Sequence, residues 1–169
     1  INMLDYIIDQ AYEKKMKIVM NPSPFDDKLN SCDLGKVYLF LVNEIEGEQI
    51  TGCKDKDQIL DALAEKYPNA RFVLTLGSDG AVYYDGKEKV FQDIFKVKAV
   101  DTTAAGDTFT GCMLNTVLDK GLDNLTGEDI GGMLRFANAG AALITTKRGA
   151  LRVMLEKDEI ESLLEEQTK

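Results

Sequence analysis

Apolar positions along this chain follow two different periods. Near residues 3–15 they recur every three or four positions, which is typical of an amphipathic helix. Residues 37–42 and 71–76 are instead continuous apolar runs, which are typical of strands buried on both faces of a parallel sheet. Shorter helical patterns over 44–51 and 55–67 separate these runs. Because strands alternate with helices, we expect an α/β layered domain with a largely parallel sheet.

The remaining elements are shorter or less regular. Asp85-Gly86 joins two alternating runs and predicts a hairpin turn, and Thr126 with Asp129 predicts a helix cap. No repeat, low-complexity tract or linker interrupts the chain, so the sequence predicts one folding unit over residues 1–169. The other expected elements are strands at 17–21, 81–84, 89–92 and 95–100, and helices at 108–120, from Thr126 to about Thr145, and at 156–166.

Length and charge narrow the class of protein. The chain has 169 residues, 44% of them hydrophobic and 29% charged, which is an ordinary globular balance for about one domain. Lys and Arg number 20 against 29 Asp and Glu, a net charge of −9 that argues against nucleic-acid binding. Nucleotide ligands stay open, because backbone N–H groups can hold phosphates. No apolar stretch approaches the ~18 residues of a membrane span.

Histidine is absent, and this excludes whole classes of chemistry. Ser-His-Asp and Cys-His catalysis and histidine-ligated zinc are all ruled out, so acid–base chemistry needs carboxylate, lysine, tyrosine or cysteine groups. The three cysteines, Cys32, Cys53 and Cys112, are too widely spaced for a CxxC metal knuckle. They indicate unpaired thiols in a reducing compartment, and we therefore expect a cytoplasmic protein.

Three polar or glycine-containing segments follow predicted strands. They are residues 43–46, 75–80 and 101–107. In an open parallel sheet ligands bind beyond the carboxyl ends of the strands, so we expect these segments to converge on one rim.

The segment 101–107 carries the strongest chemical signal. Ala104, Ala105 and Gly106 have little or no side chain, so a ligand can approach their backbone at a helix N-terminus, where free N–H groups attract phosphate. Asp107 lies in the same turn and could accept a hydroxyl proton during attack on phosphorus. The alternative, of equal weight from the residues alone, is that Asp107 is a plain helix N-cap.

The other two segments have simpler alternatives of their own. Gly77 to Gly80 could bring backbone amides to a phosphate, or could be only a turn that leads into a hairpin. Asn43 and Glu46 lie one helical turn apart and could face one ligand, or could be a solvated acidic helix start. Asn138 could contact a ligand or could simply be exposed. Neither GxxxxGK[ST] nor GxGxxG occurs.

At residues 101–111, Asp-Thr-Thr-Ala-Ala-Gly-Asp-Thr-Phe-Thr-Gly, the chain closely resembles the second signature of the ribokinase-like (phosphofructokinase-B, PfkB) sugar kinases. The resemblance continues in order over nearly the whole chain. Residues 21–24 resemble the family's loop after a strand, 43–46 its NxxE motif, 75–80 its nucleotide loop and 136–139 its helix beside the adenine. It implies a three-layer α/β/α sandwich with a mostly parallel central sheet. Within the family, 103–108 looks nearer to ribokinases than to fructokinases.

The resemblance implies ATP-dependent phosphoryl transfer to a sugar hydroxyl. Asp107 would be the catalytic base, and the amides of Ala105 and Gly106 would form the anion hole. Glu46 would orient Mg²⁺ and its waters. The nucleotide would be lined by Asn43, Thr75, Gly77, Ser78, Gly80, Gly106 and Asn138. A K⁺-like monovalent cation would be held by Asp101, Thr103, Ile144, Lys147 and Gly149, mostly through carbonyl oxygens.

Two departures from the family pattern limit these implications. Val153 stands where ribokinases usually offer a serine hydroxyl, which weakens the case for the cation site. Family members are also about twice as long as one ~150-residue domain. Because this sequence starts at Ile1 and matches only the C-terminal part, we expect a C-terminal catalytic portion that lacks the N-terminal half, the β-lid and most sugar-binding residues.

The sequence therefore predicts a chain that binds ATP and a small sugar and does not bind nucleic acid or membranes. A homodimer, or self-association through the sheet edge at 17–21, is also expected. Two alternatives remain open: a nucleoside or other small-alcohol kinase of the same superfamily, and a non-catalytic nucleotide-binding module.

Overall fold

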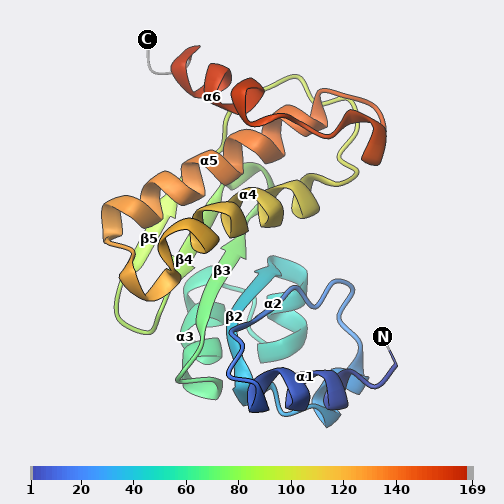
Figure 1. The fold of residues 1–169 in the computed structure, drawn as a ribbon, viewed down its shortest axis with the longest axis vertical. Coiled ribbons are helices and arrows are strands. Elements are labelled where there is room, and N and C mark those ends of the chain that lie inside the picture. Colours follow the sequence, from blue (N-terminus) through green and yellow to red (C-terminus); the bar gives the residue numbers. More distant parts are fainter. Residues whose placement is uncertain (1, 167–169) are drawn as a thin grey trace. The chain divides into compact units, whose positions relative to one another are not determined.

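The computed structural model describes residues 2–166 as an α/β chain (Figure 1). The helices are α1 (Leu4–Glu13), α2 (Glu44–Thr51), α3 (Lys56–Lys66), α4 (Ala105–Lys120), α5 (Gly127–Thr145) and α6 (Lys157–Glu166). The strands are β1 (Ile18–Met20), β2 (Val37–Asn43), β3 (Arg71–Thr75), β4 (Ala81–Tyr84) and β5 (Lys89–Gln92), and their hydrogen-bonded order is β1-β2-β3-β4-β5.

These elements group into two compact units, a division that the sequence pattern does not predict. The first unit contains the chain up to Gly77 together with Val82–Lys89, and the second contains Ser78–Ala81 together with the chain from Val90 onward. Among the described residues, no helix has both the length and the apolar character needed to cross a membrane.

The first unit is built on three parallel strands. β1 pairs with β2, and β2 pairs with β3 in a register that sets Leu41 against Val73 and Asn43 against Thr75. Leu39 and Leu41, on one face of β2, are as deeply buried as Phe40 and Val42 on the other. The apolar runs therefore predicted correctly strands that are buried on both faces.

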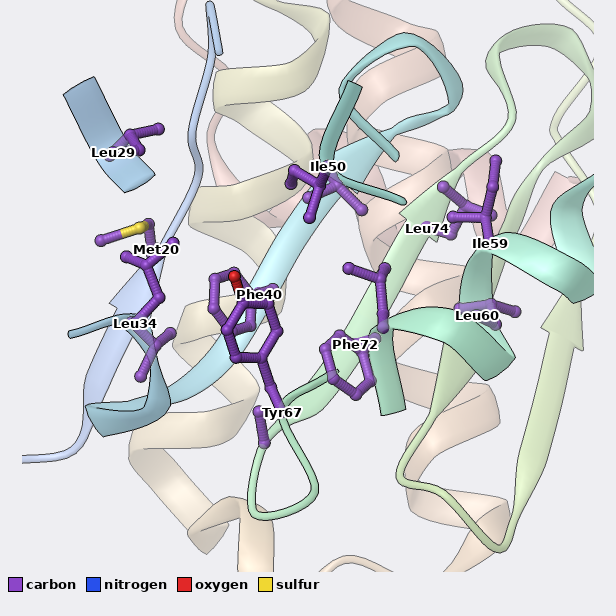
Figure 2. Packing of buried hydrophobic residues seen from close by; sticks show 14 of the residues in the cluster. Met20, Leu29, Leu34, Phe40, Ile50, Ile59, Leu60, Tyr67, Phe72 and Leu74 are labelled. Atoms are coloured by element: carbon purple, nitrogen blue, oxygen red, sulfur yellow. The ribbon is translucent and has the colours of Figure 1, made fainter. Parts of the chain in front are cut away.

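Aromatic and aliphatic side chains from helices and strands form the core of this unit (Figure 2). The Phe40 ring stacks against Tyr67 and Phe72 at centroid distances of 5.0 and 5.8 Å. Ile59 and Leu60 of α3 are fully buried in the same cluster. Burial of each side chain of this size stabilises the fold by about 1.5–3 kcal/mol. This core therefore holds β2 and β3, whose ends carry predicted site residues, in place.

Two helices dominate the second unit. α4 and α5 lie side by side (Figure 1), and they approach closely at Gly140, where an added Cβ would lie 2.7 Å from Cys112 Sγ and 3.5 Å from Thr108 Cγ2. A smaller cluster joins Ile160 of α6 to Phe95 and Ala142. The absence of a side chain at Gly140 therefore allows close packing between these two helices.

Most predicted elements are confirmed within one or two residues, and the helix caps are well formed. Gly52 ends α2 at φ 76° and Gly121 ends α4 at φ 74°, both in the region that favours glycine. Thr126 and Asp129 form a capping box at the start of α5. β1 lies at one end of the strand order, as expected.

Two predictions of local structure are wrong. Residues 95–100 form no strand, because Phe95 anchors the segment in the core and the Val100 N–H donates to the Thr145 carbonyl at 2.7 Å. α4 begins at Ala105 rather than at residue 108, since Ala104 adopts a left-handed conformation (φ 64°) that lets the helix start at once.

Candidate functional site

The first unit brings two of the three predicted segments to one rim of its sheet. Asn43 ends β2 and is paired in register with Thr75, which ends β3. The Thr75 hydroxyl donates to the Val42 carbonyl at 3.4 Å. Parallel pairing therefore confirms the expected convergence for these two segments.

Asn43 and Glu46 form a capping box at the start of α2. The Glu46 N–H donates to Asn43 Oδ1 at 2.9 Å, and the Asn43 N–H donates to Glu46 Oε2 at 3.0 Å. Glu46 is only 4% exposed, so the interpretation as a solvated helix start is wrong. With one oxygen committed to the cap, Glu46 fits poorly as a direct ligand of Mg²⁺.

In the second unit, the N-terminus of α4 presents free backbone donors. The Ala105 N–H donates to the Thr102 carbonyl at 3.2 Å, whereas those of Gly106 and Asp107 have no acceptor among the described residues. No atom lies within 4 Å of the place where a Cβ on Gly106 would stand. The open helix end fits a phosphate or a developing oxyanion, with Gly106 as a better donor than Ala105.

Asp107 is the third residue of α4. The N-cap is Ala104, so the alternative that Asp107 is a plain N-cap is wrong. Its side chain is exposed and makes no hydrogen bond or ion pair with any residue that the structure describes. A carboxylate with no competing partner beside free N–H donors can take up a proton.

Asp101 ties the loop before α4 to the turn after α5. Its Oδ1 accepts the Thr103 N–H at 2.9 Å and its Oδ2 accepts the Gly149 N–H at 3.0 Å. Hydrogen bonds from Thr103, and after them the one from Gly149, lower the pKa of the Asp101 carboxyl from 3.8 to about 2. The carboxylate is thus ionised at neutral pH and holds the two loops together.

This tie brings together three of the residues expected at a cation site, Asp101, Thr103 and Gly149. Residues 2–166 contain no group of three acidic or cysteine side chains that could hold a metal ion. Backbone carbonyls are the donors that remain, and the one on Ile144 already accepts the Lys147 N–H at 3.1 Å. Such a donor set suits a monovalent cation better than Mg²⁺.

The predicted nucleotide loop is exposed where it turns. Gly77 and Ser78 form part of a short 3-10 turn, with Gly77 at φ 55° and the Ser78 hydroxyl donating to Asp79 Oδ1 at 3.3 Å. Gly80 is buried at φ 100° against the end of β5.

Asn138 is buried rather than exposed, so that interpretation is wrong. It is 4% exposed, and its Nδ2 donates to the carbonyls of Gln92 and Asp93 at 3.0 and 3.1 Å. Nothing in the sequence pattern indicated Gln92 or Asp93 as partners of Asn138. Their role depends on the positive φ of Gly80 and on the end of β5 at Gln92, and only the three-dimensional structure shows these features.

Comparison with known proteins shows the family to which the chain belongs. Residues 2–157 match the family described as pfkB family carbohydrate kinase. The probable fructokinase-2 of Arabidopsis thaliana is 35% identical over 143 residues, which are 83% of this chain and 43% of that protein. The chain spans about half the length of most of the curated relatives it matches.

Solved structures show the same fold. The ribokinase of Thermotoga maritima has a TM-score of 0.72 at 27% identity, covering 94% of this chain and 52% of its own. The ribokinase of Arabidopsis thaliana complexed with ribose and ATP has a TM-score of 0.74 at 25% identity, covering 94% of this chain and 50% of its own. The higher identity to a fructokinase gives no support to the expected leaning towards ribokinases. With its ribokinase-like fold and a family match over most of its length, the chain belongs to the pfkB family of carbohydrate kinases.

Proposed function

We propose that this chain carries the phosphoryl-transfer site of an ATP-dependent sugar kinase. The observation that carries the proposal is the N-terminus of α4, where neither the N–H of Gly106 nor the exposed carboxylate of the adjacent Asp107 has a partner among residues 2–166. Phosphoryl transfer needs little covalent chemistry from a protein, but it does need a proton acceptor and donors for phosphoryl oxygens. Both are present within one helical turn.

The proposed reaction transfers the γ-phosphoryl group of ATP to a sugar hydroxyl. A sugar hydroxyl attacks the γ-phosphorus of ATP, and its proton passes to the Asp107 carboxylate. A new bond forms between the sugar oxygen and phosphorus, the bond to the β-phosphate oxygen breaks, and ADP leaves. The N–H of Gly106, with that of Asp107, stabilises the charge that develops on the transferring group.

We further propose which residues contact the nucleotide. In the second unit these are Ser78 and Gly80. The ribokinase of Arabidopsis thaliana with bound ribose and ATP supports ATP as the phosphoryl donor and a sugar as the acceptor. The half-buried, unpaired thiols of Cys32, Cys53 and Cys112 are consistent with a cytoplasmic site of action.

The oxygen donors of this chain bear on two cations, Mg²⁺ and a monovalent cation. Mg²⁺ bound to ATP would offset phosphate charge, and we propose that Glu46 acts on it only through water, since its carboxylate caps α2. We propose a monovalent-cation site from the carbonyls of Thr103, Ile144, Lys147 and Gly149. In that site Asp101 positions the loops, and Val153, which is half-buried, adds no side-chain oxygen.

The test fuses this chain to the part of a relative that the chain does not match. The N-terminal part of the Arabidopsis thaliana probable fructokinase-2 would precede residue 2, and ADP release would be followed with a panel of sugars and nucleosides. Sugar-dependent ADP release supports the proposal. Activity with nucleosides alone would support the alternative acceptor class, and ATP binding without transfer to any acceptor would support a non-catalytic module.

A further inference from the structure

Asn138 is a buried amide in the interior of α5, a position where asparagine is unfavourable unless its side chain has a use. Its Nδ2 donates to two successive carbonyls, those of Gln92 at 3.0 Å and Asp93 at 3.1 Å. These bonds use both hydrogens of the amide, so Asn138 has no donor left to offer a ligand.

The two carbonyls lie where the chain leaves regular structure. β5 ends at Gln92, and the next helix begins at Ala105. Carbonyls beyond a strand end have no ladder partner, and a buried carbonyl without a partner is costly. Asn138 supplies that partner and thereby fixes the peptide between residues 92 and 93 against α5.

The same peptide contacts the proposed nucleotide loop. A Cβ on Gly80 would stand 2.1 Å from the Gln92 carbonyl oxygen and 3.0 Å from Asp93 Cα, and Gly80 has a φ of +100°. The backbone of Gly80 is therefore packed directly on the group that Asn138 holds. One continuous line of contacts runs from α5 through the end of β5 to the loop at residues 78–80.

We propose that Asn138 is a positioning residue: it sets the Ser78–Gly80 loop by anchoring the Gln92–Asp93 peptide and does not donate hydrogen bonds to the base of the nucleotide. The inference rests on the proposed function only for the identity of the loop's ligand. A residue that positions the loop affects every purine nucleotide equally. A residue that reads the base changes the preference between ATP and GTP.

Hydrogen exchange on the whole 169-residue chain tests the contact without needing a ligand. Asn138→Ala should speed amide exchange at residues 78–81 on the order of tenfold, because the peptide that packs on Gly80 loses its anchor. Asn138→Asp, which keeps the shape but loses the donors, should do the same and guards against misfolding of the alanine variant. The control is Thr126→Ala, which removes the cap at the other end of α5 and should leave residues 78–81 unchanged.

Nucleotide affinity then distinguishes a positioning role of Asn138 from a role in overall stability and from direct contact with the base. Asn138→Ala should weaken ATP and GTP on the order of tenfold each, with their ratio unchanged, whereas Thr126→Ala should weaken neither. Gly80→Ala should weaken both as well, and the double variant should lose less than the product of the two single losses.

Three results would overturn the inference: exchange at residues 78–81 as slow as in the wild type, a shifted ratio of ATP to GTP affinity, or independent effects of the two substitutions. Failure of the wild-type chain to bind either nucleotide would instead overturn the proposed function. The exchange measurement would still decide the role of Asn138.

Discussion

Replacing Asp107 by asparagine is the most direct probe of the proposed chemistry. The substitution keeps the size and the exposed position in the first turn of α4, and it replaces the carboxylate by a neutral amide that cannot take up the proton. A positioned general base contributes about 10²–10⁴ in rate, which corresponds to about 2.7–5.4 kcal/mol of transition-state stabilisation. Because the N–H donors of Gly106 and Asp107 are retained, the loss should stay within that range and should fall on kcat.

Nucleotide affinity should respond differently. The Asp107 carboxylate is solvent-exposed, so its repulsion of a phosphate is that of two charges in a high dielectric. Neutralising it should therefore change the Kd for ADP by no more than about fivefold, and in the direction of tighter binding. A drop in kcat with unchanged or improved ADP binding is the signature of a base that does not hold the nucleotide.

The assay is steady-state ADP release by the fusion described above, with ADP binding measured on the 169-residue chain. Asp119→Asn is the matched control, because it makes the same exposed substitution in the last turn of the same helix. Its kcat should stay within a few-fold of the wild type. An Asp107→Asn fusion that also turns over within a few-fold of the wild type would remove Asp107 from the mechanism.

Three further predictions concern packing, pH and association. Gly140→Ala should lower the free energy of unfolding by about 1–3 kcal/mol in chemical denaturation, because its Cβ would overlap Cys112 Sγ. Adding Cys112→Ala should recover part of the loss. Unchanged stability of the single variant would contradict the packing. The pKa of the Asp101 carboxyl lies at about 2, below its usual 3.8. The wild type should therefore be more stable than Asp101→Asn by a margin that is complete above about pH 5 and shrinks as the pH falls from about 4 to 2. A margin that is undiminished at pH 2 would refute the tie. With β1 at the end of the strand order and Tyr6, Ile7 and Tyr12 exposed on α1, the isolated chain should self-associate in light scattering, bind nucleotide weakly and phosphorylate no sugar. A monomer with sugar kinase activity would show this to be wrong.

The sequence by itself determined the elements whose signal is local. The apolar runs at 37–42 and 71–76 predicted strands buried on both faces, a pattern typical of parallel sheets, and the two strands pair in parallel. Thr126 with Asp129 marked a helix start, because these residues satisfy backbone groups within one turn of themselves. The small residues before Asp107 likewise indicated an open helix N-terminus.

Only the tertiary structure decided the features that depend on distant partners. The run at 95–100 has the composition of a strand, yet Phe95 packs against α5 and Val100 bonds to Thr145, so the segment never meets a ladder. Asn138 and Gln92 are 46 positions apart, and nothing in either residue indicates the other. Glu46 could have been a solvated residue at a helix start by its pattern, and it is a buried cap. Hydrogen bonds between remote segments are set by how the helices and strands pack, so a local pattern cannot show which polar side chains are left for a ligand and which are used to hold the fold.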